Sequence, residues 1–180
     1  MIPLYGTLAY TIFVVENVPI SSILVQLVFG ITLVLPLIFY GLLKRSGHIT
    51  SSNLSNTKER WLPLCINTIL LSIVVVFTNQ FNHIILRDWI ILLAIQNVMT
   101  LILLSIPFKT SIHMFNNMSL VLFLTALPIG LSPYPIIVIA TVWIILIGTA
   151  RLILKAHRFI ELIIGLSIAV IVHLGYHWCH

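Results

Sequence analysis

The feature that most constrains this chain is a series of apolar runs, each about 20 residues long, separated by short polar turns. An α-helix rises 1.5 Å per residue, so about 20 residues cross the ~30 Å hydrocarbon layer of a membrane. We place six such runs at residues 20–43, 61–81, 89–108, 114–131, 135–154 and 159–176. The sequence therefore predicts an all-α fold, a polytopic transmembrane helical bundle of about six spans.

The composition excludes an ordinary soluble domain. Of the 180 residues, 60% are hydrophobic and 7% are charged, and the mean hydropathy is +1.17. Soluble domains carry about a quarter charged residues, and a single core of this size could not bury so much Leu, Ile and Val. The length suits one integral-membrane domain, residues 1–180, whose main polar stretch is a loop at residues 44–60.

Residues 1–19 are apolar but interrupted by Pro3, Gly6, Glu16 and Pro19. The segment lacks the basic region with which a signal peptide begins. We expect a helix that lies at the membrane interface or is inserted halfway.

Aromatic and polar residues mark the predicted span ends. Four aromatic residues near these ends are Trp61, Trp89, Tyr134 and Trp178. Such positions favour an interfacial aromatic belt. The pair Arg87-Asp88 is expected in the turn between the second and third spans.

Almost all cationic residues fall on one face of the predicted bundle. Successive crossings return the chain to this face at the polar loop, before the fourth span and before the sixth. The cations there are Lys44, Arg45, Lys58, Arg60, Lys109, Arg151, Lys155 and Arg158. Cytoplasmic loops are enriched in Lys and Arg whatever the protein does, whereas a phosphate-binding site would gather the same charges on either side of the membrane. The charge pattern alone leaves both explanations and the orientation open. It gives no support for nucleic-acid binding, because no recognition module accompanies it.

A histidine and a carboxylate follow the cations near the start of the last span. Arg151 and Lys155 are four residues apart and share a helix face, His157 follows them, and Glu161 lies four residues further on. A carboxylate in a lipid-embedded helix is costly and rarely unpaired, so we expect Glu161 to orient the His157 imidazole. A histidine held in this way among cations is suited to attack a phosphorus centre. An ordinary pair between Glu161 and Arg158 is the alternative.

The pattern Arg151-x5-His157-x3-Glu161 resembles the third motif of the type 2 phosphatidate phosphatase superfamily, Ser-Arg-x5-His-x3-Asp. Upstream, Thr110-Ser111-Ile112-His113 is similar to the family's second motif, Pro-Ser-Gly-His. Asn53-x6-Arg60-Trp61 has the spacing of its first motif, Lys-x6-Arg-Pro. Order and spacing agree over residues 53–161, and the chain looks like a short, divergent bacterial member.

The resemblance implies an integral-membrane enzyme of six helices that hydrolyses a lipid or polyprenyl phosphate without a metal or other cofactor. It implies that His157 forms a phosphohistidine, that Glu161 orients it, and that His113 protonates the leaving group. The remaining residues implied in substrate binding are Arg60, Arg151, Lys58, Lys109, Ser111 and Asn53. A bacterial inner membrane is the expected location.

Several motif positions depart from the family pattern. Asn53 replaces a lysine, Ile112 replaces the glycine of the second motif, and Ala150 replaces a serine. The alternative is therefore a non-catalytic relative that binds lipid or serves as a subunit of a membrane complex. In that case we expect small residues such as Gly148 and Gly165 on outer faces, against partner subunits.

A second Ser-Gly-His stretch complicates the assignment. Residues 46–48 match the second motif better than Ser111 to His113 do, but they precede the first motif. The order of the motifs therefore favours His113.

Overall fold

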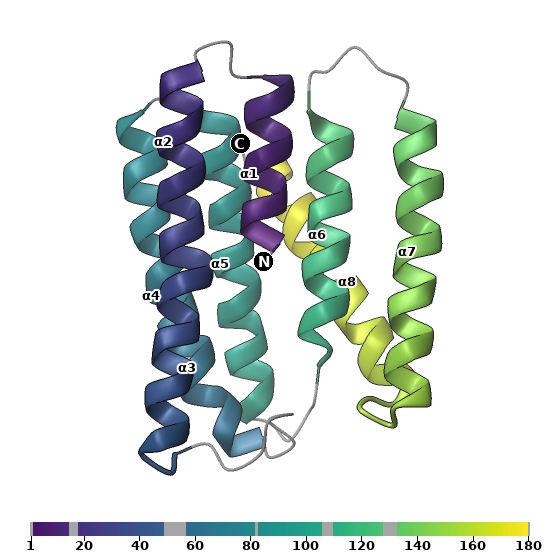
Figure 1. Ribbon diagram of the computed structural model, residues 1–180. Helices are drawn as coiled ribbons and strands as arrows, with labels where there is room; N and C mark the ends of the chain where they lie inside the picture. The colour runs from purple at the N-terminus through teal and green to yellow at the C-terminus, as the bar shows by residue number, and fades with distance from the viewer. Residues whose placement is uncertain are drawn as a thin grey trace.

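A computed structural model describes residues 2–14, 18–48, 57–81, 83–105, 110–127 and 133–179. All elements in these ranges are helices, which lie side by side in a bundle (Figure 1). They are α1 (Ile2–Phe13), α2 (Val18–Phe29), the π-helical η1 (Gly30–Val34), α3 (Leu35–Arg45), α4 (Thr57–Gln80), α5 (Ile84–Ser105), α6 (Ile112–Ala126), α7 (Pro133–Ile153) and α8 (Phe159–Cys179). The all-α prediction is confirmed.

Four helical stretches in the described ranges are long and apolar enough to cross a membrane. They are Ile23–Arg45, Glu59–Gln80, Ile84–Ser105 and Phe159–Tyr176. Shorter apolar stretches lie in α6 and α7, at Ile112–Ala126 and Ile137–Ile153. Large apolar side chains such as Val138, Ile139 and Leu174 are exposed on the outside of the bundle. These features are those of an integral membrane protein.

The first long span is a single helix with a wider π-helical turn in its middle. The segment η1 joins α2 to α3 without a break, and helical backbone angles continue through Phe29 and Leu35. Thr32 in this turn is buried, and its hydroxyl donates to the carbonyl oxygen of Val28 at 2.7 Å. Single π-helical turns often occur at functional sites, and Thr32 lines the cavity described below.

The N-terminal helix α1 is part of the bundle. It runs alongside α2, α5 and α6, and its N-terminus lies near mid-height (Figure 1). Gly6 faces the Trp89 ring so closely that an added Cβ would lie 2.0 Å from it. An interfacial helix would lie across the bundle end, so that form of our expectation for residues 1–19 does not describe α1. The packing differs because Gly6, which interrupts the segment in sequence, allows contact between α1 and α5.

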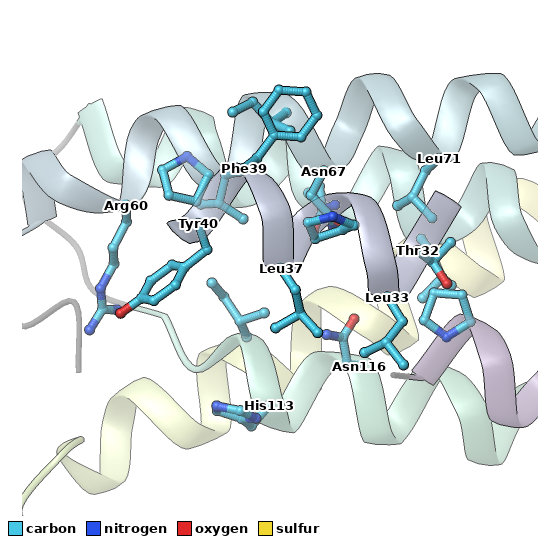
Figure 2. Close-up of a pocket in the computed structure, with 18 of the residues that line it drawn as sticks. Thr32, Leu33, Leu37, Phe39, Tyr40, Arg60, Asn67, Leu71, His113 and Asn116 are labelled. Carbon is cyan, nitrogen blue, oxygen red and sulfur yellow. The ribbon is translucent and has the colours of Figure 1, made fainter. Parts of the chain in front are cut away.

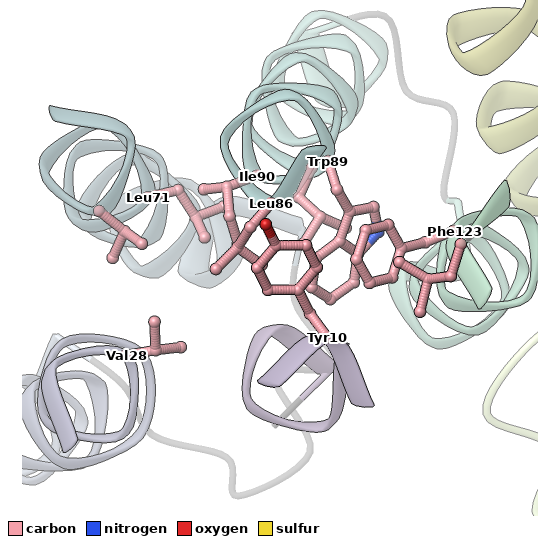
Figure 3. Packing of buried hydrophobic residues seen from close by; sticks show 10 residues of the cluster. Tyr10, Val28, Leu71, Leu86, Trp89, Ile90 and Phe123 are labelled. Carbon is pink, nitrogen blue, oxygen red and sulfur yellow. The ribbon is translucent and has the colours of Figure 1, made fainter. Parts of the chain in front are cut away.

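Trp89 belongs to the bundle core and not to an aromatic belt. Its side chain is 1% exposed and stacks on Phe123, with ring centroids 4.3 Å apart (Figure 3). Trp61, Tyr134 and Trp178 are exposed, as the belt prediction requires. Trp89 differs because α5 begins at Ile84, so the indole lies more than a turn inside the helix.

The pair Arg87-Asp88 therefore lies in α5 and not in the preceding turn. Nε and a terminal nitrogen of Arg87 donate to Asp88 at 2.9 and 2.7 Å, and the other terminal nitrogen donates to Asn79 at 3.0 Å. The two charges offset each other, which explains how the helix accommodates them. The ends of α4 and α5 are tied together by this contact.

Gly148 and Gly165 are buried within the chain, contrary to the expectation that they face partner subunits. A Cβ on Gly148 would contact Met114 and Leu162 at 3.5 and 3.7 Å, and one on Gly165 would lie 2.7 Å from the Ser111 carbonyl oxygen. Both glycines therefore allow α6, α7 and α8 to pack closely together. The two glycines lie on inner faces because α7 and α8 pack against α6 at these positions.

Candidate functional site

Ends of the helices α3 to α8 meet at one end of the bundle. The C-termini of α3 and α7 and the N-termini of α4, α6 and α8 all lie at the lower end in Figure 1. These ends carry Arg60, His113, Arg151, Lys155 and His157. Arg87 lies at the opposite end, at the start of α5. Apart from Arg87, the described cations therefore gather on one face, as the order of the apolar runs requires.

His157 and Glu161 form a partly buried hydrogen-bonded pair. The Nδ1–H of His157 donates to Oε2 of Glu161 at 2.7 Å, and the two side chains are 7% and 14% exposed. His157 lies in the turn after α7, and Glu161 lies in the first turn of α8. With Nδ1 engaged in this way, the second ring nitrogen, Nε2, is left to act as a base or nucleophile.

A capped helix end sets the position of His157 relative to Arg151. The amide of Ala156 donates to the carbonyl of Arg151 at 3.1 Å, and that of Lys155 donates to Leu152 at 3.0 Å. This is a Schellman cap, in which one residue adopts a left-handed conformation. Lys155 takes that place, with φ of 50°, where glycine is usual. The cap reverses the chain so that His157 follows Arg151 into the same site.

The start of α6 is fixed against the start of α8. The amide of Ser111 donates to the backbone carbonyl of Glu161 at 3.2 Å. The absence of a side chain at Gly165 permits this approach, because a Cβ there would meet the Ser111 carbonyl oxygen. His113, two residues after Ser111, is thereby held near His157 by backbone contacts.

A cavity of about 920 Å³ opens between these elements. Arg60, His113, Arg151, Lys155 and His157 line its cationic end. Figure 2 shows Arg60, Tyr40 and His113 at one end of the cavity and Thr32, Leu33 and Leu71 at the other. Apolar side chains from α3, α4 and α5 line the remainder, including Leu37, Phe39, Leu64 and Leu93. The cavity therefore combines a cationic end with a long apolar wall.

The surroundings favour a neutral His157. Burial lowers the pKa of its imidazole below the usual 6.5, while the hydrogen bond to Glu161 acts in the opposite direction. The positive charges of Arg60 and Arg151 lower this pKa as well. At neutral pH the imidazole can therefore keep a free electron pair on Nε2.

Some predicted residues do not join this group. Ser111 is 0% exposed and caps α6 through its backbone, and its side chain is not part of the cavity wall. Glu161 contacts the site through His157 and does not line the cavity. Asn53 and Lys109 lie outside the described residues. For Lys58, the structure describes only its place in the first turn of α4.

The second Ser-Gly-His stretch is a helix cap. Gly47 has φ of 78°, and the amide of His48 donates to the carbonyl of Leu43 at 3.0 Å at the end of α3. The Ser46 hydroxyl and Nδ1 of His48 lie 2.9 Å apart on the surface. Ser46, Gly47 and His48 do not line the cavity, so the resemblance of this stretch to the motif reflects the glycine that the turn requires.

The structure adds cavity residues that the sequence analysis missed. Asn67 and Asn116 line the middle of the cavity and Tyr40 its cationic end (Figure 2), and Asn97 is a further lining residue. A signal was available, because polar side chains inside apolar spans commonly face the interior of a bundle and mark functional sites.

Comparison with protein-family models, curated proteins and solved structures returns no match.

Proposed function

We propose that this chain is a lipid-phosphate phosphatase of the type 2 phosphatidate phosphatase kind, acting through a phosphohistidine. The observation that carries the proposal is the partly buried His157–Glu161 pair at the cationic end of the cavity. A carboxylate that holds Nδ1 aims the opposite nitrogen and stabilises the charge that develops on the ring. Arg60 and Arg151, which line the same cavity as His157, supply the anion-binding groups that phosphoryl transfer requires.

In the proposed reaction, Nε2 of His157 attacks the phosphorus and the bond to the lipid oxygen breaks. Arg60 and Arg151 bind the phosphoryl oxygens with their guanidinium groups. His113 gives a proton to the departing alkoxide and then takes one from the water that cleaves the phosphohistidine. The products are a lipid alcohol and inorganic phosphate.

The shape of the cavity supports a lipid substrate. Its cationic end suits a phosphate, and the wall formed by residues such as Leu37 and Leu64 suits a hydrocarbon chain. The proposal includes the six-span topology of the family, with α6 and α7 as the two further spans. It also includes a bacterial inner membrane as the location, with the orientation of the cationic end left to experiment.

A second candidate function is lipid-phosphate binding without catalysis, in a subunit of a membrane complex. The contact between the Ser111 amide and the Glu161 carbonyl favours it. In the family's second motif a tight glycine turn presents backbone amides to phosphate, whereas this amide already has a partner. Such a protein would bind the same ligands and release no phosphate.

The deciding experiment measures phosphate release from a panel of lipid phosphates by the purified protein. We expect turnover that is lost in His157→Ala and kept in His48→Ala, a matched histidine change in the exposed cap of α3. Trapping of radiolabelled phosphate on the protein by rapid acid-free denaturation would identify the phosphohistidine. Lipid-phosphate binding by folded protein that never releases phosphate would establish the second candidate.

A further inference from the structure

The cavity closes at the end opposite its cations. Leu71 on α4 and Leu93 on α5 line the cavity and belong at the same time to the packed apolar core of the bundle. One helical turn further from the cations, Val74 on α4 and Ile90 on α5 are 0% exposed, and so is Val28 on α2. Figure 3 shows Leu71, Ile90 and Val28 among the side chains of this core. The cavity therefore ends where tightly packed apolar side chains begin.

The N-terminal helix α1 contributes to this closed end. The elements η1, α5 and α6 border the cavity, and all three also pack against α1. The start of α1 lies near mid-height of the bundle (Figure 1), and Pro3 in its first turn lines the cavity. From there α1 runs away from the cationic end, with Gly6 against the Trp89 ring. The space between η1, α5 and α6 is therefore occupied by α1 on one side of mid-height and by the cavity on the other.

The depth of the cavity follows from α4, which runs along it. Arg60 and Leu71 both line the cavity, and they lie at its opposite ends in Figure 2. At 1.5 Å per residue, their positions are separated by about 16 Å along the helix axis. With a C–C bond of about 1.5 Å and a bond angle of about 111°, an extended hydrocarbon chain advances about 1.25 Å per carbon. The distance from the cationic end to the closed end therefore corresponds to about 13 carbons.

We propose that this cavity holds a hydrocarbon chain of the lipid phosphate along its length and limits that chain to about 13 carbons. The inference rests on the proposed function and selects among its substrates. A longer chain would have to displace core side chains such as Leu71 and Leu93, and the insertion of extra methylenes into a well-packed core is unfavourable. The substrate class that fits is a medium-chain lipid phosphate, whereas a long polyprenyl phosphate exceeds the available depth.

The first test measures binding of straight-chain alkyl phosphates, which share one headgroup and differ only in chain length, to the purified protein in detergent. Ligand concentrations are expressed as mole fractions in the micelle, so that partitioning of the chain into detergent cancels. We expect affinity to be maintained up to about 13 carbons and to fall about fivefold or more within the next four or so, the effect of overpacking. Undiminished affinity for chains of about 20 carbons overturns the proposal. This series uses the unaltered protein, so it is decisive even where a variant does not fold.

Substitutions at Leu33 locate the closed end. Leu33 in η1 lines the cavity, is half-buried, and lies beside Thr32 in Figure 2. Leu33→Phe is expected to shorten the limit by about two carbons, and Leu33→Ala to lengthen it by about two. Leu35 is the matched control, since it lies two positions further along the same helix, is 37% exposed and does not line the cavity. Leu35→Phe and Leu35→Ala are expected to keep the limit of the unaltered protein. A limit that is the same in both Leu33 variants overturns the assignment.

Failure of this inference is distinguishable from failure of the proposed function, because binding is measured without turnover. A chain-length limit without phosphate release overturns the phosphatase proposal and leaves the limit in place. Phosphate release together with binding that does not depend on chain length overturns the limit alone.

Discussion

At the scale of single residues, Glu161 makes two contacts with different consequences. Its carboxylate accepts from His157, and its backbone carbonyl accepts from Ser111. Glu161→Gln keeps the size and the backbone contact but removes the negative charge. We expect kcat for phosphate release to fall by about a hundredfold or more, with little change in KM because Glu161 does not line the cavity.

Steady-state kinetics on the purified variant check this prediction. Asp88→Asn, a carboxylate-to-amide change at the opposite end of the bundle, serves as the control and should leave kcat unaltered. An unchanged kcat in Glu161→Gln would contradict the orienting role.

The pH dependence of phosphate release tests the protonation state of His157. Attack requires the neutral imidazole, and burial holds the pKa of His157 below 6.5. We therefore expect kcat/KM to fall on acidification only below pH 6.5. Because Glu161 raises this pKa, Glu161→Gln should move the acid limb to still lower pH. A limb that lies above 6.5, or that moves upward in the variant, would show that another group controls the reaction.

Several of the candidate residues could be found from sequence because each lies near a helix end. Alternate helix ends share a face, so Arg60, His113, Arg151 and His157 were expected on one side of the bundle. The burial of Ser111 could not be foreseen, since it depends on the close approach of Gly165 from another helix. No local pattern near Ser111 encodes that contact.

At the scale of helices, the contact between α6 and α8 depends on Gly165. A Cβ there would lie 2.7 Å from the Ser111 carbonyl oxygen and 3.2 Å from Met114 Cβ. We expect Gly165→Ala to lower the free energy of unfolding by about 1–3 kcal/mol through overpacking. It should also lower phosphate release, because the start of α6 carries His113.

Unfolding in mixed detergent micelles measures this effect. Gly175→Ala, on the same helix, is the matched control because an added Cβ there meets nothing within 4 Å. That change should stabilise α8 by roughly 0.5–1 kcal/mol, as alanine does in a helix interior. Equal effects of the two substitutions would contradict the packing argument.

The cap at the end of α7 stores a local strain. A residue with a side chain in the left-handed region costs about 1–2 kcal/mol, and Lys155 occupies that region. Lys155→Gly should raise the free energy of unfolding by up to about 1 kcal/mol after the entropic cost of glycine. It should also weaken lipid-phosphate binding, since Lys155 is one of the cationic residues that line the cavity.

The cap of α3 provides the reverse experiment. Gly47 already occupies the left-handed position there, so Gly47→Ala should destabilise the protein by about 1 kcal/mol without affecting binding. A stabilising Gly47→Ala, or a destabilising Lys155→Gly, would show that backbone strain is not the controlling factor at these caps.

Helix positions were more predictable than helix limits. The apolar runs located the long spans, because a run of that length must cover lipid or core. The start of α5 was placed five residues too late, since Arg87 and Asp88 look like turn residues when their mutual pairing is unknown. The π-helical turn η1 could not be predicted from the pattern of apolar residues, because each of its residues is also compatible with an ordinary α-helix.

At the scale of the whole molecule, two histidines outside the spans link stability to pH. Burial lowers the pKa of both His83 and His157 below 6.5. At a pH between the lowered pKa of the folded protein and the value of 6.5 in the unfolded chain, these histidines bind more protons in the unfolded chain than in the folded protein. The two neutral histidines therefore contribute fully to the free energy of unfolding above pH 6.5, and this contribution is lost as the pH falls through the lowered pKa values.

Thermal unfolding midpoints in detergent, measured on both sides of pH 6.5, check this expectation. His83→Gln should make the unfolding midpoint fall less on acidification, because it removes one of the two titrating groups. The glutamine can still hydrogen-bond the Tyr10 hydroxyl, which lies 3.2 Å from Nδ1 of His83. Stability that rises on acidification through this window would contradict the assignment.

The arrangement of the site also has a consequence for biosynthesis. Arg60, His113 and Arg151 precede the His157–Glu161 pair in the chain, and α8 follows all the other helices that the structure describes. A nascent chain at the ribosome therefore displays the anion-binding groups before the imidazole and its carboxylate have been made. In the reaction that we propose, attack on a membrane lipid therefore requires α8 to be in place, and translation intermediates that lack it are expected to be inert.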